Sequence, residues 1–225
     1  MMSNFPLKVV RYISCYLALA GGGKPETVEE VADYCVDRPI LMAQVRSEIV
    51  ALGKILERHA PAHSLEIGTN YGGTLLLLCS LSPARAQIIS VDLPAGRFGG
   101  GYPKRKIPLF RKFPKPGQQL HLIRGDSHRE ETRQRVLQVL DGKLLDYLFL
   151  DGDHTYDGVR QDFEMYAPLV RSGGIVCLHD IAFHPGDRTC QVDKFWGEIK
   201  NYYRYKEIIE HPEQGWGGLG ILFLS

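Results

Sequence analysis

The sequence lacks any apolar run of the ~18–20 residues that a membrane-spanning helix needs, so we expect no membrane partner. It also lacks a C-x-x-C pair, and its five cysteines are widely spaced, which argues against a structural zinc site and a disulfide framework. There is almost no excess of charge: 27 Lys and Arg against 26 Asp and Glu give a net charge of +1, so we expect no nucleic-acid partner. A chain of 225 residues suits one compact domain.

The spacing of the cysteines indicates that they are reduced thiols, and reduced thiols favour a cytoplasmic location. One segment instead has features of a secretory signal peptide. Its apolar residues 12–20 follow Lys8 and Arg11 and end in Ala18-Leu19-Ala20, which resembles a signal-peptidase site. The alternative is a short buried or amphipathic helix ended by the glycines at 21–23. We adopt this alternative and predict a cytoplasmic protein.

Residues 1–60 have the pattern of helices. Thr27 and Glu30 have the spacing of a capping box at the start of a short helix. Apolar residues then recur at steps of three and four from Ile40 to Leu56, which predicts an amphipathic helix over about 40–59, with Pro39 in its first turn. We expect these helices to form a cover, which either lies over the site or makes a dimer contact, so a homo-oligomer stays open.

From residue 61 onward apolar strands alternate with helical segments. Such alternation predicts a parallel sheet with helices on both faces, a doubly wound, Rossmann-like α/β fold. The strands are predicted at 64–67, 87–92, 120–124, 144–151 and 174–180, and two more at 205–209 and 219–224.

Five of these strands end in, or run directly into, a glycine or a polar residue. In parallel sheets, ligands bind outside the carboxyl ends of the strands, so these residues are expected to share one edge. They are Gly68, Asp92, Asp126, Asp151, and His179 with Asp180.

The long segment 93–118 is rich in glycine, proline and basic residues. A loop of this length in a compact domain is usually functional or mobile. We interpret it either as a lid or substrate loop or as a solvated basic insertion. A basic loop could also bind RNA, but we disfavour that interpretation, because its only candidate stacking groups are Phe98, Tyr102, Phe110 and Phe113.

The turn after the first strand reads E-x-G-x-x-x-G from Glu66 to Gly72. A dinucleotide-binding turn needs G-x-G-x-x-G, and Asn70 stands in place of its second glycine. Glu66 would repel a pyrophosphate but attract an ammonium group. Asp92 can accept hydrogen bonds from ribose hydroxyls, and Asp126 or its neighbouring backbone can meet an adenine amine. A ligand with a cation, a ribose and a base but no phosphate fits this set, and S-adenosylmethionine is such a ligand.

The segment from Leu65 to Thr74 resembles the first motif of the class I S-adenosylmethionine-dependent methyltransferases, and Asp92 and Gly125-Asp126-Ser127 resemble its later motifs. The similarity runs from about residue 40 to 182. It implies a seven-stranded sheet with an antiparallel C-terminal hairpin, and a methyltransferase domain over residues 61–225. The cofactor-binding residues that it implies are Glu66, Gly68, Thr69, Asn70, Tyr71, Gly73, Asp92, Asp126, Ser127 and Asp151.

The strands that end at Asp151 and at His179-Asp180 are expected to be neighbours. Their side chains can then converge on one hard cation such as Mg²⁺, which would lower the pKa of a substrate hydroxyl. His154 is the candidate base that takes the proton. The alternative is purely structural: Asp151 caps the following helix, and His179 is a hydrogen-bonded strand-end residue. We expect Asp153 to cap that helix through its side chain.

The arrangement is similar to metal-dependent small-molecule O-methyltransferases, in particular the branch of macrolide sugar O-methyltransferases and cephalosporin-hydroxylase-like proteins. Asp151 and His154 match their Asp-Gly-x-His segment. The chain departs from that pattern at His179, where an acidic residue is expected, and imidazole suits Mn²⁺ or Zn²⁺ better than Mg²⁺.

We therefore predict an enzyme that transfers a methyl group from S-adenosylmethionine to a small-molecule hydroxyl, with Mg²⁺ or Mn²⁺. A non-catalytic, regulatory S-adenosylmethionine-binding protein of the same fold is the alternative, and an NAD-dependent dehydrogenase is disfavoured by Asn70. Two other interpretations of 151–156 fail. A dehalogenase-like phosphatase would carry its Asp motif near the chain start, and an EF-hand loop needs Gly where Tyr156 stands.

Overall fold

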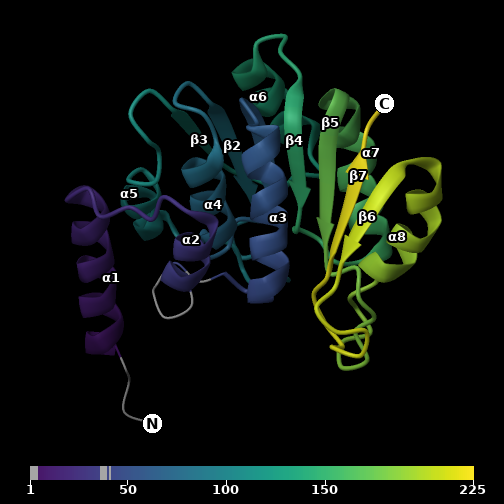
Figure 1. Cartoon of the computed structure of the whole chain (residues 1–225), viewed down its shortest axis with the longest axis horizontal. Helices are drawn as coiled ribbons and strands as arrows, with labels where there is room; N and C mark the ends of the chain where they lie inside the picture. Colours follow the sequence, from purple (N-terminus) through teal and green to yellow (C-terminus); the bar gives the residue numbers. More distant parts are fainter. Residues whose placement is uncertain (1–4, 36–39, 41) are drawn as a thin grey trace.

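Seven strands form a single sheet in the order β3-β2-β1-β4-β5-β7-β6 (Figure 1). The computed structural model describes residues 5–35, 40 and 42–225, and for residues 5–9 only the backbone. The strands are β1 (His63–Ile67), β2 (Gln87–Asp92), β3 (Gln119–Arg124), β4 (Leu145–Leu150), β5 (Val170–His179), β6 (Arg204–Ile208) and β7 (Leu219–Phe223). The first five are parallel, and β7 is antiparallel to both β5 and β6. The predicted seven-stranded, mostly parallel sheet with its C-terminal hairpin is confirmed.

The helices cover the sheet on both sides. The elements in chain order are α1 (Phe5–Ala20), α2 (Val28–Tyr34), α3 (Arg46–His59), α4 (Gly73–Leu81), α5 (Ile107–Phe110), α6 (Glu130–Leu140), α7 (Tyr156–Tyr166) and α8 (Val192–Ile199). Short 3₁₀ turns η1, η2 and η3 span Lys104–Lys106, Ala167–Leu169 and Lys200–Tyr202. None of the described helices has both the length and the apolar character of a bilayer-crossing segment.

Two hydrophobic cores lie on opposite faces of the sheet, because successive strand residues point to opposite sides. Tyr147 and Phe149 of β4 pack with helices α1 to α5, whereas Leu148 and Leu150 of the same strand pack with α6, α7 and α8. Helix α4 is apolar all round, and its residues 73–79 are buried. Both faces of the central strands are therefore closed to solvent, and their ends are the places where polar groups can meet a ligand.

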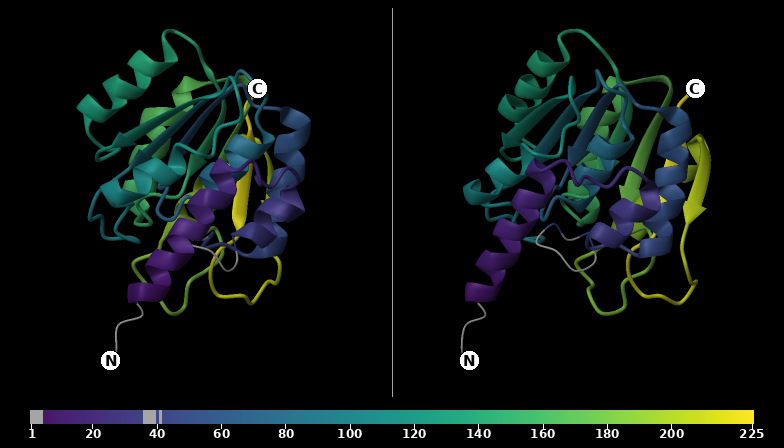
Figure 2. Two further views of the ribbon diagram at one scale, coloured as in Figure 1. Left: turned by 90° about the vertical axis from the view of Figure 1, so that its left-hand side faces the viewer. Right: turned by 60° about the vertical axis from the view of Figure 1, so that its left-hand side comes forward.

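The N-terminal helices share a core with the sheet. Val28 of α2 and Ile49 of α3 belong to the same apolar cluster as α4. Figure 2 shows α1 at the margin of the molecule, with its beginning farthest from the sheet. Tyr12 ties α1 to the loop before α5 by donating a hydrogen bond to the carbonyl oxygen of Arg105 at 2.6 Å. The division of the chain at residue 60 stays a prediction.

The predicted capping box is present, since the Thr27 side chain accepts from the Glu30 N–H and the Glu30 carboxylate accepts from the Thr27 N–H. The predicted start of the next helix is wrong. Helix α3 begins at Arg46, because its N-cap residue Val45 is extended, with φ −71° and ψ 127°, and residues 42–44 are not helical. Pro39, which was expected in the first turn, lies outside the described residues.

Glu48 of α3 fastens the loop between β6 and β7. The side chain is fully buried, and its carboxylate accepts hydrogen bonds from the N–H groups of Glu210 (3.1 Å) and Gly218 (2.9 Å) and from Nε2 of Gln214 (2.7 Å). This loop also reaches the carboxyl end of β5, where the Gly217 N–H donates to Asp180 at 3.1 Å. One buried carboxylate thus connects an N-terminal helix to the edge of the sheet.

Replacing Glu48 by alanine leaves three donors without their acceptor, so we expect Glu48→Ala to lower the free energy of unfolding by about 2–4 kcal/mol. Glu57→Ala, an exposed change on the same helix, is the matched control and should change it by less than about 0.5 kcal/mol. Urea denaturation measures both. Equal stability of the two variants would contradict the fastening role of Glu48.

Candidate functional site

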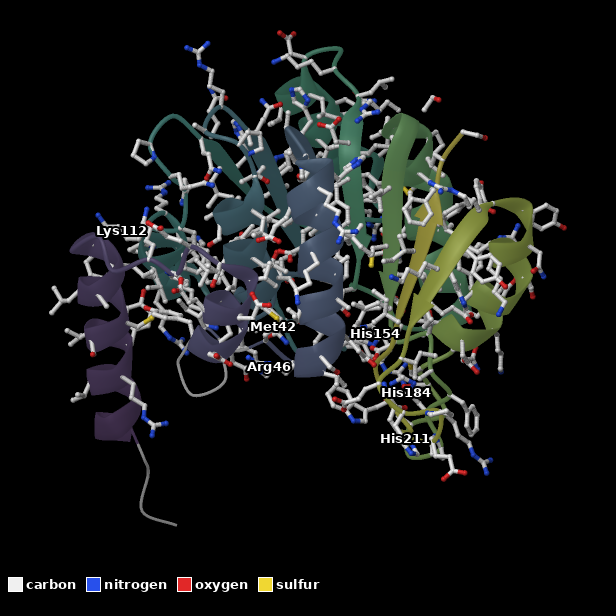
Figure 3. The ribbon with its side chains drawn as sticks, in the orientation of Figure 1. Met42, Arg46, Lys112, His154, His184 and His211 are labelled. Atoms are coloured by element: carbon white, nitrogen blue, oxygen red, sulfur yellow. The ribbon has the colours of Figure 1, made fainter. Side chains whose placement is uncertain are left out.

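A cavity of about 550 Å³ opens at the carboxyl ends of the parallel strands. In Figure 3 the labelled side chains of His154 and His184 lie beyond the end of β5 at this edge. Every strand of the parallel set contributes to the wall of the cavity, either by its last residues or by the turn that follows. Among the lining residues are Gly68, Asn70, Asp92, Phe98, Asp126, Ser127, Asp151, His154, His179, Asp180, His184, Cys190 and Trp216. The expectation that these strand-end groups share one edge is therefore confirmed.

The turn after β1 passes very close to β4. Gly68 has φ +91°, and a Cβ at this position would overlap the carbonyl oxygen of Asp151. The Gly68 N–H donates to Val91 (2.9 Å) and the Asp151 N–H to Ile67 (2.9 Å), which continues the ladders past the ends of the strands. Glycine is required here for both conformation and space, and the turn leaves room for a ligand beside it.

Three further residues of the predicted cofactor motif, Tyr71, Gly73 and Thr69, line a small adjoining cavity of about 30 Å³. The Thr69 hydroxyl is 2.6 Å from that of Ser90, which ties the turn to β2. Asn70 has φ +44° and donates its N–H to Asp92 at 3.2 Å. The turn is thus held in shape from β2 before any ligand binds.

Glu66 lies beneath the turn and is absent from the walls of both cavities. It is fully buried, accepts a short hydrogen bond from Thr74, and its Oε2 has no partner among the described residues. Burial raises the pKa of its carboxyl to about 8. A contact with the ammonium group of a ligand stays a prediction, whereas a hydrogen bond that fixes the start of α4 is present.

Asp92 ends β2 with only 7% of its surface exposed. Its Oδ2 accepts from the N–H groups of Asn70 (3.2 Å) and Tyr102 (2.8 Å). Burial raises the pKa of this carboxyl, and the backbone donors oppose the shift. Asp92 therefore both joins the first turn to the loop at 102 and faces the cavity.

The turn after β3 is held by α7. Asp126 accepts the N–H of His128 at 3.0 Å, and Tyr166 donates to the carbonyl oxygen of Ser127 at 2.7 Å. The His128 Nε2 lies 3.3 Å from the buried carboxylate of Asp162. Because of this pairing, the pKa of His128 is raised to about 9. His128 lines the cavity and lies outside the predicted set of site residues, although it directly follows the Gly-Asp-Ser motif.

Two carboxylates and two imidazoles form a compact cluster where β4 and β5 end. The Asp151 Oδ1 is 3.1 Å from Nδ1 of His179, and the Asp180 Oδ2 is 2.9 Å from Nδ1 of His154 and 3.3 Å from Nδ1 of His179. The His154 Nε2 in turn faces Asp151 at 3.5 Å. Sequence reasoning named all four residues, and the structure brings them together.

These contacts set the charges of the cluster. Burial opposes protonation of His154, but its pairing with Asp180, Cys190 and Asp151 raises its pKa to about 10. The pKa of His179 is also raised, against burial, by the same two carboxylates. Asp180 responds in the opposite sense: despite burial, its imidazole partners lower its pKa. These shifts favour imidazolium forms of His154 and His179 paired with the carboxylate of Asp180.

The conformation of Asp180 is unusual, since its φ of +64° lies in the left-handed region that non-glycine residues seldom adopt. Its Oδ1 holds it there by accepting from the Gly217 N–H and by facing Nε2 of His184, each at 3.1 Å. Strained residues of this kind concentrate at functional sites. We therefore regard Asp180 as the centre of the cluster.

Four further residues contact the cluster or line the cavity. Gln44 donates its side-chain amide to Asp151 Oδ2 at 3.0 Å, and the Phe98 ring stacks on His154 with centroids 4.7 Å apart. His184 and Trp216 come from the loops that follow β5 and precede β7. Gln44, His184 and Trp216 lie in no motif, and only their contacts in the folded chain identify them.

The loop 93–118 has two parts. Residues 96–99 line the cavity, whereas Tyr102, Phe110 and Phe113 are buried in the core that includes α4 and α5. The interpretation of all four aromatic residues as stacking groups is therefore wrong for these three, and Phe98 alone of the four faces the cavity.

Asp153 does not cap α7 as expected. Thr155 is the N-cap and accepts the Gly158 N–H, while Asp153 accepts from the N–H and hydroxyl of Thr155.

The donor atoms of Asp151, His179 and Asp180 fit a metal ion. One ligand atom from each lies within 4.8 Å of the others. Carboxylate oxygens with one imidazole suit Mg²⁺ less well than Mn²⁺ or Zn²⁺. The cluster can therefore hold a divalent cation beside the turn at Gly68.

A model of a family described as "Methyltransferase domain" matches residues 65–181, slightly more than half of the chain. The chain belongs to this methyltransferase family. The match runs from β1 to just beyond Asp180, so it contains the turn at Gly68, Asp92, Asp126 and the whole carboxylate cluster. The resemblance to class I S-adenosylmethionine-dependent methyltransferases is thereby confirmed.

Two curated relatives are themselves uncharacterised. A protein of Sinorhizobium fredii is 25% identical over 166 residues, which are 72% of this chain and 17% of that protein. A protein of Acanthamoeba polyphaga mimivirus is 32% identical over 116 residues, 52% of this chain and 50% of that protein. The chain thus matches at most half the length of these relatives.

Solved structures share the fold of this methyltransferase domain. The O-methyltransferase of Bacillus cereus, in complex with S-adenosylhomocysteine, is 15% identical with a TM-score of 0.60 over 89% of this chain and 91% of that chain. TomG from Streptomyces achromogenes, an O-methyltransferase of tomaymycin synthesis, is 18% identical. Its TM-score is 0.56, and the match covers 90% of this chain and 91% of TomG. MycE of the mycinamycin pathway, in complex with Mg and S-adenosylhomocysteine, is 19% identical. Its TM-score is 0.58, and the match covers 89% of this chain and 55% of MycE.

The close approach at Gly68 yields a stability test. Gly68→Ala adds a Cβ where the Asp151 carbonyl stands and forces φ +91° on alanine, so we expect it to lower the free energy of unfolding by more than about 3 kcal/mol. Gly142→Ala shares the positive φ (+75°) but has open space, so it should cost only about 1 kcal/mol. Similar costs in urea denaturation would show that the backbone contact is unimportant.

Proposed function

We propose that this methyltransferase domain transfers a methyl group from S-adenosylmethionine to a hydroxyl oxygen of a small molecule, with a divalent cation at Asp151, His179 and Asp180. The observation that carries the proposal is one cavity lined by the turn after β1, by Asp92 and Asp126, and by the cation ligands at the ends of β4 and β5. Its volume of about 550 Å³ lies within the range of small-molecule sites, roughly 300–1,000 Å³.

The cofactor would bind along the ends of β1, β2 and β3. Asp92 is placed to accept from ribose hydroxyls, and the turn at Asp126 and Ser127 to meet the adenine. Gly68 and Asn70 offer backbone close to the methionine part. The sulfonium would then lie near β4, with its methyl group toward Asp151 and the open part of the cavity.

The reaction balances without a further reagent. The substrate oxygen attacks the methyl carbon in line, the C–S bond breaks as the C–O bond forms, and the electron pair returns to sulfur. The hydroxyl proton must go to a base, for which we propose His154. The protein contributes mainly positioning, because the leaving thioether is neutral and needs no proton.

His154 needs a cation nearby to act as a base. With its pKa near 10, the imidazole would hold its proton at neutral pH. When bound, a divalent cation would supply positive charge that lowers the pKa of the substrate hydroxyl and the pKa of the nearby His154 imidazole. Phe98 keeps the ring in place, and Gln44 keeps Asp151 oriented toward the cluster.

The non-catalytic alternative has one observation in its favour. His179 already pairs with both carboxylates, so the cluster is neutralised without a metal. Titration calorimetry with S-adenosylhomocysteine tests the shared cofactor site, and failure of the folded protein to bind would contradict both functions. Methyl transfer to any compound of a hydroxyl panel, with Mg²⁺ or Mn²⁺, would exclude the non-catalytic function.

Two variants separate the cofactor role from the catalytic role. We expect Asp92→Asn, which keeps one acceptor oxygen, to weaken S-adenosylhomocysteine binding by roughly ten-fold, the effect of about one charged hydrogen bond. Asp151→Asn should leave binding within about three-fold while turnover falls at least roughly a hundred-fold.

Glu131→Ala, an exposed change on α6, is the control for both measurements and should alter neither. Unchanged binding in Asp92→Asn would remove the ribose assignment. Full activity in Asp151→Asn would remove the cation role.

A further inference from the structure

One cysteine stands apart from the other four. Cys190 lines the cavity and is 7% exposed, whereas Cys15, Cys35, Cys79 and Cys177 belong to the core on the other face of the sheet. Its sulfur, a ring nitrogen of His154 and a carboxylate oxygen of Asp180 all lie within 4.8 Å of one another. A thiol, an imidazole and a carboxylate from three separate segments thus converge on one point.

The backbone fixes Cys190 in this position. The loop between β5 and α8 turns at Asp187, whose carbonyl oxygen accepts the Cys190 N–H at 3.2 Å. The next residue, Gln191, donates its N–H to the carbonyl oxygen of His154 at 2.7 Å. Because this bond joins the two loops directly, the thiol and the imidazole are held on the same side of the cavity.

We propose that His154, Asp180 and Cys190 bind a divalent metal ion that accepts thiolate ligands, such as Zn²⁺ or Co²⁺. Thiolate with imidazole and carboxylate is a donor set for such ions and not for Mg²⁺, which prefers oxygen ligands. Three protein ligands leave one tetrahedral position for water or substrate. This donor set overlaps the oxygen-rich one at Asp151, His179 and Asp180 only through Asp180.

The surroundings orient the ligands as metal sites require. His184 and the Gly217 N–H hold Oδ1 of Asp180, each at 3.1 Å, so that Oδ2 faces His154. The stacked Phe98 fixes the plane of the imidazole. Nδ1 of His154 already points at Asp180 at 2.9 Å, with Nε2 toward Asp151.

One consequence rests on the proposed function. A neutral imidazole that coordinates through Nδ1 carries its only proton on Nε2, so it has no nitrogen left to accept a proton. An ion at His154, Asp180 and Cys190 would therefore remove His154 as a base. We expect Zn²⁺ to bind this site and to suppress the methyl transfer that Mg²⁺ or Mn²⁺ supports.

Cobalt spectroscopy tests the site without an activity assay. Titration of the reduced 225-residue chain with Co²⁺ should produce an intense thiolate-to-cobalt charge-transfer band in the near ultraviolet, which a large excess of Mg²⁺ does not remove. Cys190→Ser should lose the band and bind Zn²⁺ at least roughly ten-fold more weakly. Cys15→Ala, a cysteine of α1, is the matched control and should keep both.

A measurement on the unaltered protein guards against misfolding of the variant. X-ray absorption of the zinc-loaded protein should show one sulfur scatterer at about 2.3 Å. Absence of the cobalt band, its persistence in folded Cys190→Ser, or a zinc shell without sulfur would each overturn the site. Cofactor binding is measured separately by calorimetry, so its failure would contradict the proposed function while leaving this metal site standing.

Discussion

The burial of both faces of the sheet is the constraint on which the molecule depends. Strands β1, β4 and β5 carry mostly apolar side chains toward two cores, so the charged groups that line the cavity have no place along the middle of these strands. They collect where the strands end, and because these strands are parallel neighbours, all the ends lie at one edge. The convergence of Gly68, Asp151, His179 and Asp180 follows from this topology.

The edge is held in shape by contacts from parts of the chain far from it in sequence. Gln44 before α3 reaches Asp151, and the loop before β7, fastened by Glu48, delivers Gly217 to Asp180. The N-terminal helices thus do more than cover the sheet, since one of their connections forms part of the cavity wall. A strained, fully hydrogen-bonded Asp180 is the result, and its carboxylate is shared by two candidate donor sets.

Local patterns in the sequence predicted the sheet and the polar strand ends well, because alternation of apolar segments and short motifs are properties of neighbouring residues. The early start assigned to α3 failed because the apolar residues Ile40 and Val45 lie outside the helix: Ile40 is buried, and Val45 is the extended N-cap. Tyr102 and Phe110 appeared to be loop aromatics because their burial depends on contacts with distant elements. His184, Phe98 and Cys190 occupy irregular loops, so only the folded chain reveals that they lie beside Asp180 and His154.

The central claim is that the turn at Gly68, the ends of β2 and β3, and the carboxylate cluster form one site for cofactor and substrate. A crystal structure of the protein with S-adenosylhomocysteine and Mn²⁺ tests this most directly. The account predicts the ribose at Asp92, the adenine at Asp126 and Ser127, and the ligand sulfur on the side of Asp151, with electron density for a cation at Asp180. Cofactor bound anywhere outside this cavity, or with its sulfur turned away from Asp151, would contradict it.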